Sequence, residues 1–94
     1  MIISRIIWKE KFAKKIEGKH KVTTFEVEEI LQGKRKVRRL AKGDVEGEDI
    51  YLALGQTDSG RYLSVFFILK KNHSAIPISA RDMDNKERRQ HECK

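Results

Sequence analysis

Apolar residues are most concentrated in the second half of the chain, in short runs typical of strands. Residues 61–70 carry apolar side chains on both faces of an extended chain, which predicts a central strand. Residues 57–60, Thr-Asp-Ser-Gly, are typical of a tight turn, so we expect residues 50–56 and 61–70 to pair as an antiparallel hairpin. Pro77 cannot donate to a ladder, so the next strand, residues 75–80, lies at an edge or turns this position outward.

The first half of the chain has the spacing of two amphipathic helices. Residues 9–19 place apolar residues on one side and lysines on the other, and we expect Gly18 to end this helix. Thr23 and Glu26 have the spacing of a capping box, in which each side chain satisfies a backbone N–H at the start of the second helix. Gly33 is then expected to close the second helix in a left-handed conformation.

Three more segments belong to the sheet and its connections. Residues 2–8 are rich in isoleucine and predict a strand, and residues 34–42 predict a strand at a sheet edge with a basic exposed side. Residues 43–49 are expected to form an acidic loop between this edge strand and the hairpin.

The segment after residue 81 is strongly charged and predicts a final helix that Asp82 or Asp84 can cap. Met83 and Cys93 are its only apolar members, so this helix lies on the surface or docks weakly. The predicted fold class is therefore α+β: a small antiparallel sheet with two N-terminal helices packed on it and a polar C-terminal helix, in one domain over residues 1–94.

Charge adds a partner class to this picture. The chain has 21 Lys and Arg against 14 Asp and Glu, a formal net charge of +7. The charge is segregated in blocks, and residues 33–43 hold six basic residues and no acidic one. A basic face of this kind favours nucleic acid as partner. The alternatives are that the charge serves solubility and that edge lysines prevent aggregation of the sheet.

Other classes of protein are disfavoured by what the sequence lacks. Cys93 is the single cysteine, so an internal disulfide cannot form and a reducing cytoplasm fits best. Arg5 interrupts the apolar start, and no run approaches the roughly 18 apolar residues of a membrane helix. The sequence has no glycine-rich phosphate loop and no metal-ligand spacing among its Cys and His residues, so we expect neither cofactor nor metal.

Several motifs together resemble one family. They are Ile78-Ser79-Ala80-Arg81, Glu87-Arg88, Ala53-Leu54-Gly55, Gly60-Arg61-Tyr62-Leu63, Trp8, Lys19-His20 and the helical segment of residues 22–31. In this order and spacing the chain resembles the BrnT-type toxins of bacterial and archaeal toxin–antitoxin pairs. It departs from the family at His91, where a tyrosine commonly follows the motif's glutamate by four residues.

This resemblance implies a RelE-like ribonuclease fold and a cytoplasmic toxin that inhibits translation by cleaving RNA without a metal. It also implies neutralisation by a small cognate antitoxin similar to BrnA. Operator DNA would be reached only through the complex with that antitoxin, and no membrane would be involved.

Metal-free cleavage needs a base for the ribose 2′-hydroxyl, cations for the phosphate and an acid for the leaving oxygen. We expect Arg61 and Arg81 to bind the phosphate, since guanidinium groups match its oxygens bidentately. Glu87 or His91 would be the base, and the other, or His20, the acid. Alternatively Glu87 only orients Arg81 or His91, and His20 is structural. Further RNA contacts are expected from Lys19, Lys36, Arg38, Arg88 and Arg89.

A second hypothesis from a different class stays open at this point. The basic segments could serve a non-catalytic module that binds nucleic acid electrostatically as a co-repressor, or a degenerate toxin that only binds its antitoxin. A requirement for the 2′-hydroxyl discriminates between them, because a nuclease of this mechanism spares DNA. Tyr51 and Tyr62 are candidates for base stacking, although strand aromatics more often belong to the core.

Overall fold

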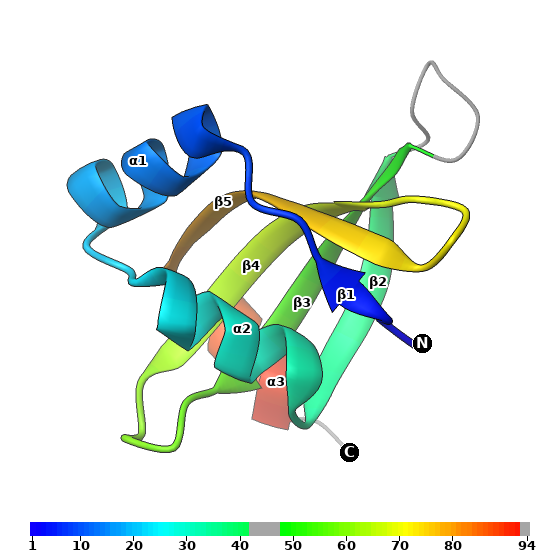
Figure 1. The fold of residues 1–94 in the computed structure, drawn as a ribbon. Coiled ribbons are helices and arrows are strands. Elements are labelled where there is room, and N and C mark those ends of the chain that lie inside the picture. The colour runs from blue at the N-terminus through cyan, green and yellow to red at the C-terminus, as the bar shows by residue number, and fades with distance from the viewer. Residues whose placement is uncertain (42–47, 93–94) are drawn as a thin grey trace.

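The computed structural model describes residues 1–41 and 48–92. Within these residues, five strands form one sheet in the order β1-β5-β4-β3-β2 (Figure 1). Neighbouring strands are antiparallel except for β1, which runs parallel to β5. The strands are β1 (Arg5–Ile6), β2 (Arg35–Ala41), β3 (Asp49–Gln56), β4 (Tyr62–Leu69) and β5 (Ser74–Asp82).

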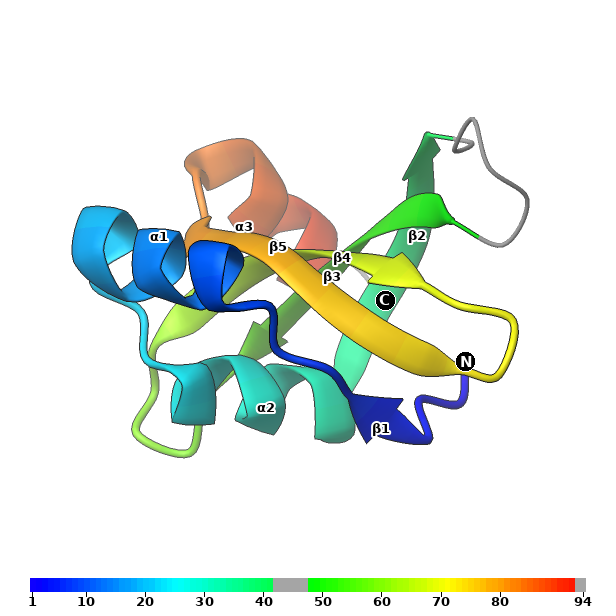
Figure 2. The ribbon, with the colours of Figure 1, turned by 45° about the horizontal axis from the view of Figure 1, so that its top comes forward.

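Three helices accompany the sheet in the described part of the chain: α1 (Glu10–His20), α2 (Thr24–Gln32) and α3 (Asn85–Glu92). Helix α2 lies in front of the sheet in Figure 1 and α3 behind it, and the turned view of Figure 2 separates the same two layers. Helix α1 packs mainly along β5. The predicted α+β fold, with two N-terminal helices packed on a small antiparallel sheet, is confirmed. None of these helices has the length and apolar character needed to span a membrane.

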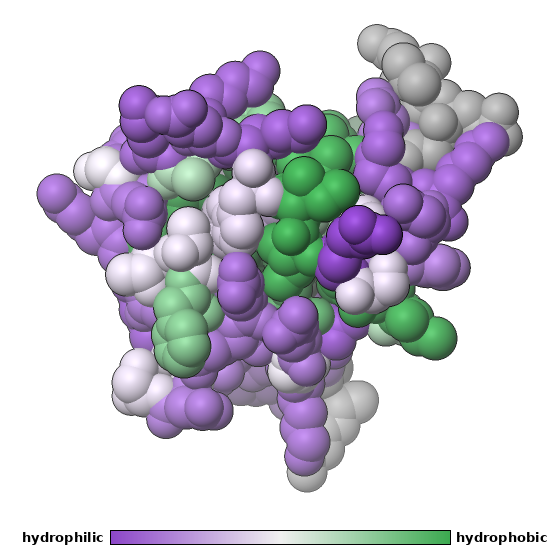
Figure 3. All heavy atoms as spheres, viewed as in Figure 1, coloured by the Kyte–Doolittle hydropathy of each residue, from purple (hydrophilic) through white to green (hydrophobic). Residues whose placement is uncertain are grey.

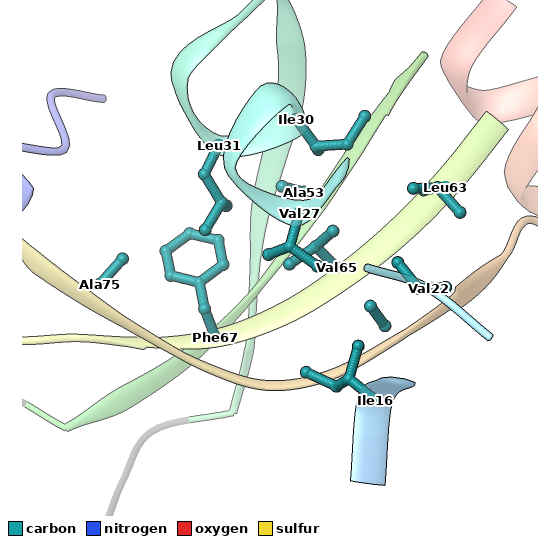
Figure 4. Close-up of a cluster of buried hydrophobic side chains, with 11 residues drawn as sticks. Ile16, Val22, Val27, Ile30, Leu31, Ala53, Leu63, Val65, Phe67 and Ala75 are labelled. Carbon is teal, nitrogen blue, oxygen red and sulfur yellow. The ribbon is translucent and has the colours of Figure 1, made fainter. Parts of the chain in front are cut away.

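The hydrophobic core fills the space between the sheet and the first two helices (Figure 4). Strand β4 supplies Leu63, Val65 and Phe67, none of which is exposed to solvent. Burying one such side chain contributes about 1.5–3 kcal/mol, so this layer fixes the sheet against α1 and α2. The complete cluster consists of Ile16, Val22, Val27, Ile30, Leu31, Ala53, Leu63, Val65, Phe67, Ala75 and Ala80.

The hairpin and the central strand form as expected. Strands β3 and β4 pair from Asp49 opposite Leu69 to Gln56 opposite Tyr62, and β4 is the middle strand of the sheet. Gly60 in the connecting turn has a φ of 98° and so adopts the conformation that favours glycine. Because side chains alternate along a strand, residues 62, 64 and 66 of β4 point to the face opposite the core, where α3 lies.

The ends of the first two helices show one confirmed prediction and two wrong ones. The capping box is present: the Thr23 backbone N–H donates to Glu26 at 3.0 Å, and the Glu26 N–H donates to the Thr23 hydroxyl at 3.1 Å. Helix α1 does not end at Gly18, because it continues to His20 and ends where Lys21 turns left-handed with a φ of 57°. A glycine inside a helix costs only about 1 kcal/mol relative to alanine, which the core contacts of α1 offset.

Gly33 follows α2 in an extended conformation, with φ −101° and ψ −160°, so the predicted left-handed closure is wrong. The reason for glycine here is space rather than a positive φ. A Cβ at this position would lie 2.7 Å from the carbonyl oxygen of Glu29, closer than real Cβ contacts occur. Any side chain would therefore push the start of β2 away from the end of α2.

The sheet edges differ in how closely they match the predictions. Strand β1 is much shorter than the strand expected over residues 2–8, whereas β2 is an edge strand as expected. Strand β5 is the second strand of the sheet, but β1 pairs only with Ser74 and Ala75, so the outer side of Pro77 has no partner strand. Most of the acidic loop expected over residues 43–49 lies outside the described residues, and so does Cys93.

The face seen in Figure 3 is hydrophilic over α1 and shows apolar atoms near its middle and at its right margin. Exposed large apolar residues lie at the N-terminus and on α2, where Ile2 is 74% and Phe25 is 70% exposed. The charged groups around Arg81 considered below are on the opposite face of the sheet, under α3.

Candidate functional site

Three alternate residues of β4 point toward α3, and each contacts a charged side chain. The Arg88 guanidinium carbon lies 3.6 Å from the ring centroid of Tyr62. The Ser64 hydroxyl donates to a Glu87 carboxylate oxygen at 2.8 Å. The Arg81 guanidinium carbon lies 5.4 Å from the ring centroid of Phe66. The face of β4 therefore holds two guanidinium groups on aromatic rings with a carboxylate between them.

Arg81 and Glu87 form a bidentate ion pair. The two terminal guanidinium nitrogens of Arg81 donate to the two carboxylate oxygens of Glu87, each at 2.7 Å. The Asp84 backbone N–H donates to the same carboxylate at 3.0 Å. With the Ser64 hydroxyl, the carboxylate accepts four hydrogen bonds. Glu87 is only 7% exposed, and these four hydrogen bonds allow its charged carboxylate to be buried there.

The electrostatics of the pair follow from these contacts. Burial by itself raises the pKa of Glu87, but hydrogen bonds from Arg81, the Asp84 backbone and Ser64 outweigh it, and the pKa lies below its ordinary value. The hydrogen bond with Glu87 raises the pKa of Arg81 despite partial burial. Both groups are therefore charged at neutral pH, and Glu87 is a weak proton acceptor.

Glu87 also determines where α3 begins. Its backbone N–H donates to the Asp84 carboxylate at 2.8 Å, while the Asp84 N–H donates to the Glu87 carboxylate, which is a capping box. Asp84, rather than Asp82, is thus the cap. Helix α3 contains no apolar residue, and it is held to the sheet by a buried carboxylate. The surface position was predicted from the lack of apolar residues, but this polar anchor was not.

His91 lies one turn after Glu87 on α3. Its ring meets the Tyr62 ring edge-on, with centroids 5.7 Å apart. Its Nδ1 atom is buried and has no hydrogen-bond partner among the described residues. A buried nitrogen without a partner is costly, so this atom is an unsatisfied polar group next to the Arg81–Glu87 pair.

Arg61 belongs to a separate cluster. Its guanidinium donates to Asp82 at 2.7 and 3.2 Å, to Glu26 at 3.1 and 3.3 Å and to the Lys21 carbonyl at 2.9 Å. The hydrogen bond with Asp82 raises the pKa of Arg61 and lowers that of Asp82. These contacts tie the ends of β4 and β5 to the junction between α1 and α2. The phosphate-binding role expected for Arg61 stays a prediction, which this geometry disfavours.

Two of the four basic residues of β2, Lys36 and Arg38, share a face with Arg81. The strand register places Lys36 opposite Leu54, Leu54 opposite Ser64 and Ser64 opposite Arg81, in one row across four strands. At about 4.8 Å between neighbouring strands, the two ends of this row are roughly 14 Å apart. Arg38 follows two residues after Lys36 and so lies on the same face.

The other predicted residues are more dispersed. Lys19 and His20 occupy the last turn of α1, and Arg89 is exposed on α3. The structure thus brings Arg81, Glu87, His91 and Arg88 together and places Arg61 in a different cluster. Sequence reasoning missed Ser64, and its signal was a single hydroxyl inside an otherwise apolar strand. No group of three or more His, Cys, Asp or Glu residues in the described ranges could hold a metal ion.

Comparison with known proteins identifies the family. A family model described as the ribonuclease toxin BrnT of a type II toxin–antitoxin system matches residues 8–87. The chain belongs to the BrnT family. This membership confirms the resemblance drawn from the motifs. The family is one of ribonuclease toxins, each belonging to a toxin–antitoxin system.

The fold of this BrnT-family chain also has a known counterpart. The crystal structure of the ribonuclease toxin BrnT from Brucella abortus matches it with a TM-score of 0.64 and 23% sequence identity. The match covers 86% of this chain and 97% of the Brucella chain. At this identity the likeness establishes the fold. No curated protein matches the sequence.

Proposed function

We propose that this BrnT-family protein is a toxin that cleaves RNA without a metal ion, by attack of the ribose 2′-hydroxyl on the adjacent phosphate, and so inhibits translation. The observation that carries the proposal is the cluster of Arg81, Glu87 and Ser64 with Arg88 and His91 beside it. Family membership supplies the ribonuclease class, and this cluster supplies groups that fit the chemistry.

Arg81 is assigned to the scissile phosphate. A guanidinium has five N–H groups, and the hydrogen bonds to Glu87 and to the Asp82 carbonyl use three of them. The remaining donors are available to phosphate oxygens, whose negative charge increases in the transition state. Arg88, which lies on Tyr62 and pairs with Glu92 at 3.2 Å, is assigned to a neighbouring phosphate. Glu87 acts through Arg81 as a positioning residue, since its own oxygens are occupied.

Proton transfer is assigned to His91, with His20 as the second candidate. The base removes the 2′-hydroxyl proton, the oxygen attacks phosphorus, and the bond to the 5′-oxygen breaks as the acid gives it a proton. The products would be a 2′,3′-cyclic phosphate and a 5′-hydroxyl. His91 is favoured over Glu87 because the pKa of Glu87 is lowered and its carboxylate already accepts four hydrogen bonds, so Glu87 is a poor base.

The partners proposed here follow from the family and from charge. We expect a small antitoxin similar to BrnA to cover the cationic face, operator DNA to be bound only through that complex, and the reaction to take place in the cytoplasm. Isolation of the untagged protein always without a co-encoded chain would count against this partner.

The decisive experiment uses a mixed-sequence RNA and its all-DNA counterpart, incubated with the purified protein in EDTA and analysed on a gel. We expect cleavage of RNA alone and loss of cleavage in Arg81→Ala. Arg5→Ala changes an exposed arginine on β1, which pairs with the far end of β5 from Arg81, so it is the matched control and should cleave normally. Activity that requires an added metal ion would overturn the metal-independent mechanism.

The second candidate function is a non-catalytic module that binds nucleic acid. The row from Lys36 to Arg81 favours it, because a cationic face binds RNA and DNA through their phosphates whether or not chemistry follows. Salt-sensitive binding of both polymers with no cleavage of either would establish this function in place of the nuclease.

A further inference from the structure

A cleft of about 220 Å³ lies beside the site described above, between β2, β3 and the last turn of α3. Leu52 and Leu54 of β3 form its apolar floor, and each is at most 4% exposed. Its other lining residues are Lys36, Val37, Arg38 and Gln90. The cleft thus combines an apolar floor with two cations and one amide.

The walls of the cleft are held in place by a cross-link. The Lys36 ammonium donates to the Gln90 backbone carbonyl at 2.8 Å, which joins β2 to the end of α3. In contrast, the Gln90 side-chain amide and the Arg38 guanidinium make no hydrogen bond or ion pair within residues 1–41 and 48–92. One amide donor pair, one amide acceptor and one guanidinium plane are therefore available to a ligand.

The ligand must suit both halves of this lining. A nucleobase has an apolar π-face that packs on leucine side chains and under a guanidinium, and an edge whose donors and acceptors pair with an amide. The cations at the rim suit the phosphates attached to it. The cleft also shares a cross-strand row with Arg81: Leu54 is two strands away, roughly 10 Å by the usual strand spacing.

We propose that this cleft binds a nucleobase of the RNA next to the phosphate held at Arg81, and that the Gln90 amide reads the edge of that base. Gln90 is then a specificity-determining residue of the nuclease, and this assignment rests on the proposed function. A groove on the other face of the molecule provides a contrast. That groove is lined by Phe25, Glu28, Glu29, Gln32, Gly33 and Asp58, and its three carboxylates would repel RNA.

Cleavage preference is the first test. RNA oligonucleotides that differ in one base beside the cleavage site are compared for wild type, Gln90→Ala and Gln32→Ala. Gln32 lines the acidic groove and is the matched control. We expect wild type and Gln32→Ala to favour the same base, and Gln90→Ala to lose about tenfold of this preference while it still cleaves the disfavoured substrates. An unchanged preference in Gln90→Ala would overturn the proposal.

Nucleotide binding is the second test, and it does not depend on catalysis. The methyl groups of Leu52 and Leu54 are followed by NMR during titration with each of the four nucleoside monophosphates and with inorganic phosphate. We expect nucleotides to shift these signals and inorganic phosphate to leave them in place, while the core residues Leu31 and Leu63 stay unchanged with all ligands.

The two tests separate the cleft from the nuclease. Shifts at Leu52 and Leu54 in a protein that cleaves no RNA would support the base site and overturn the proposed activity. RNA cleavage without such shifts, and with the same preference in Gln90→Ala, would support the nuclease and overturn the base site.

Discussion

Two arginines near the ends of β4 and β5 have opposite surroundings. Arg61 is enclosed by Glu26, Asp82 and the Lys21 carbonyl, so two carboxylates share one guanidinium and the cluster carries a net negative charge. Arg81 has one carboxylate partner, Glu87, and Arg88 lies close by on the same face of β4.

This difference separates an arginine that holds the fold from one that is prepared for a ligand. A guanidinium between two carboxylates has lost the charge that would attract phosphate, and the hydrogen bonds of Arg61 use four of its five N–H groups. A guanidinium held along one edge by a single buried carboxylate is fixed in orientation but keeps donors on its other edge. Residue type alone cannot distinguish the two cases, because both arginines occur in family-like motifs.

The different roles of the two arginines are tested most directly by replacing each one and measuring RNA cleavage. We expect Arg81→Ala to lower the cleavage rate by at least about 100-fold, the usual cost of losing a donor to transition-state charge. Arg61→Ala should lose less than about tenfold once rates are corrected for the folded fraction. Equal losses in the two variants would contradict the separate roles.

The Arg61 cluster should also contribute measurably to stability. Arg61→Ala leaves two carboxylates facing each other without a cation, and we expect the free energy of unfolding to fall by about 2 kcal/mol, measured by urea denaturation at pH 7. Arg38→Ala is the control, since Arg38 is exposed and makes no ion pair among the described residues. A variant at Arg61 as stable as this control would show that the cluster adds nothing to folding.

Acid should weaken both clusters. The pKa values of Glu26, Asp82 and Glu87 are lowered in the folded protein, so the unfolded chain takes up protons first as pH falls. Their stabilisation is complete above the ordinary carboxyl range, about pH 4, and is lost as pH falls through the lowered values.

Glu87→Gln should reduce stability by about 1 kcal/mol at pH 7, a value limited by the solvent exposure of Arg81. It should also reduce the loss of stability between pH 7 and pH 3, compared by urea denaturation at each pH. If wild type and the variant lost the same amount over this interval, Glu87 would not be ionised in the native protein.

The smallest effect concerns the salt dependence of RNA binding. Each phosphate contact to single-stranded RNA contributes about 0.7 to the slope of log affinity against log salt concentration. Arg88→Ala should lower this slope by about that amount in fluorescence-anisotropy titrations, and Arg61→Ala should leave it unchanged. A lower slope in Arg61→Ala would place its guanidinium on the RNA after all.

The sheet could be predicted because its signals are local or periodic. Runs of adjacent residues are enough to predict the central strand, the hairpin with Gly60 and the Thr23 capping box. The end at Gly33 was misjudged because this glycine serves a close approach to the Glu29 carbonyl, which depends on where the chain passes in space. Gly18 has open space around it, and α1 continues past it to His20.

The site could be predicted less well, for a related reason. Motif resemblance selected Arg61, Arg81 and Glu87 together, but only the three-dimensional arrangement shows which carboxylate pairs with which arginine. Ser64 and Gln90 were missed because one is a lone polar residue in a strand and the other one of many polar residues on α3. The apolar neighbours of Ser64 are its only signal along the chain, and Gln90 has none.

The attachment of α3 to the sheet through polar contacts and a buried carboxylate has an evolutionary consequence. An apolar docking face would couple every substitution on the helix to the packing of the sheet. Here Glu87 is anchored by hydrogen bonds, Arg88 and His91 lie on the Tyr62 ring, and the Gln90 backbone carbonyl accepts from Lys36. The side chains of Lys86, Arg89 and Gln90 take no part in these contacts, so they can be exchanged with little cost to folding. Related toxins could diverge in the RNA they choose by changing the exposed positions of this helix, while the fold beneath it stays constant.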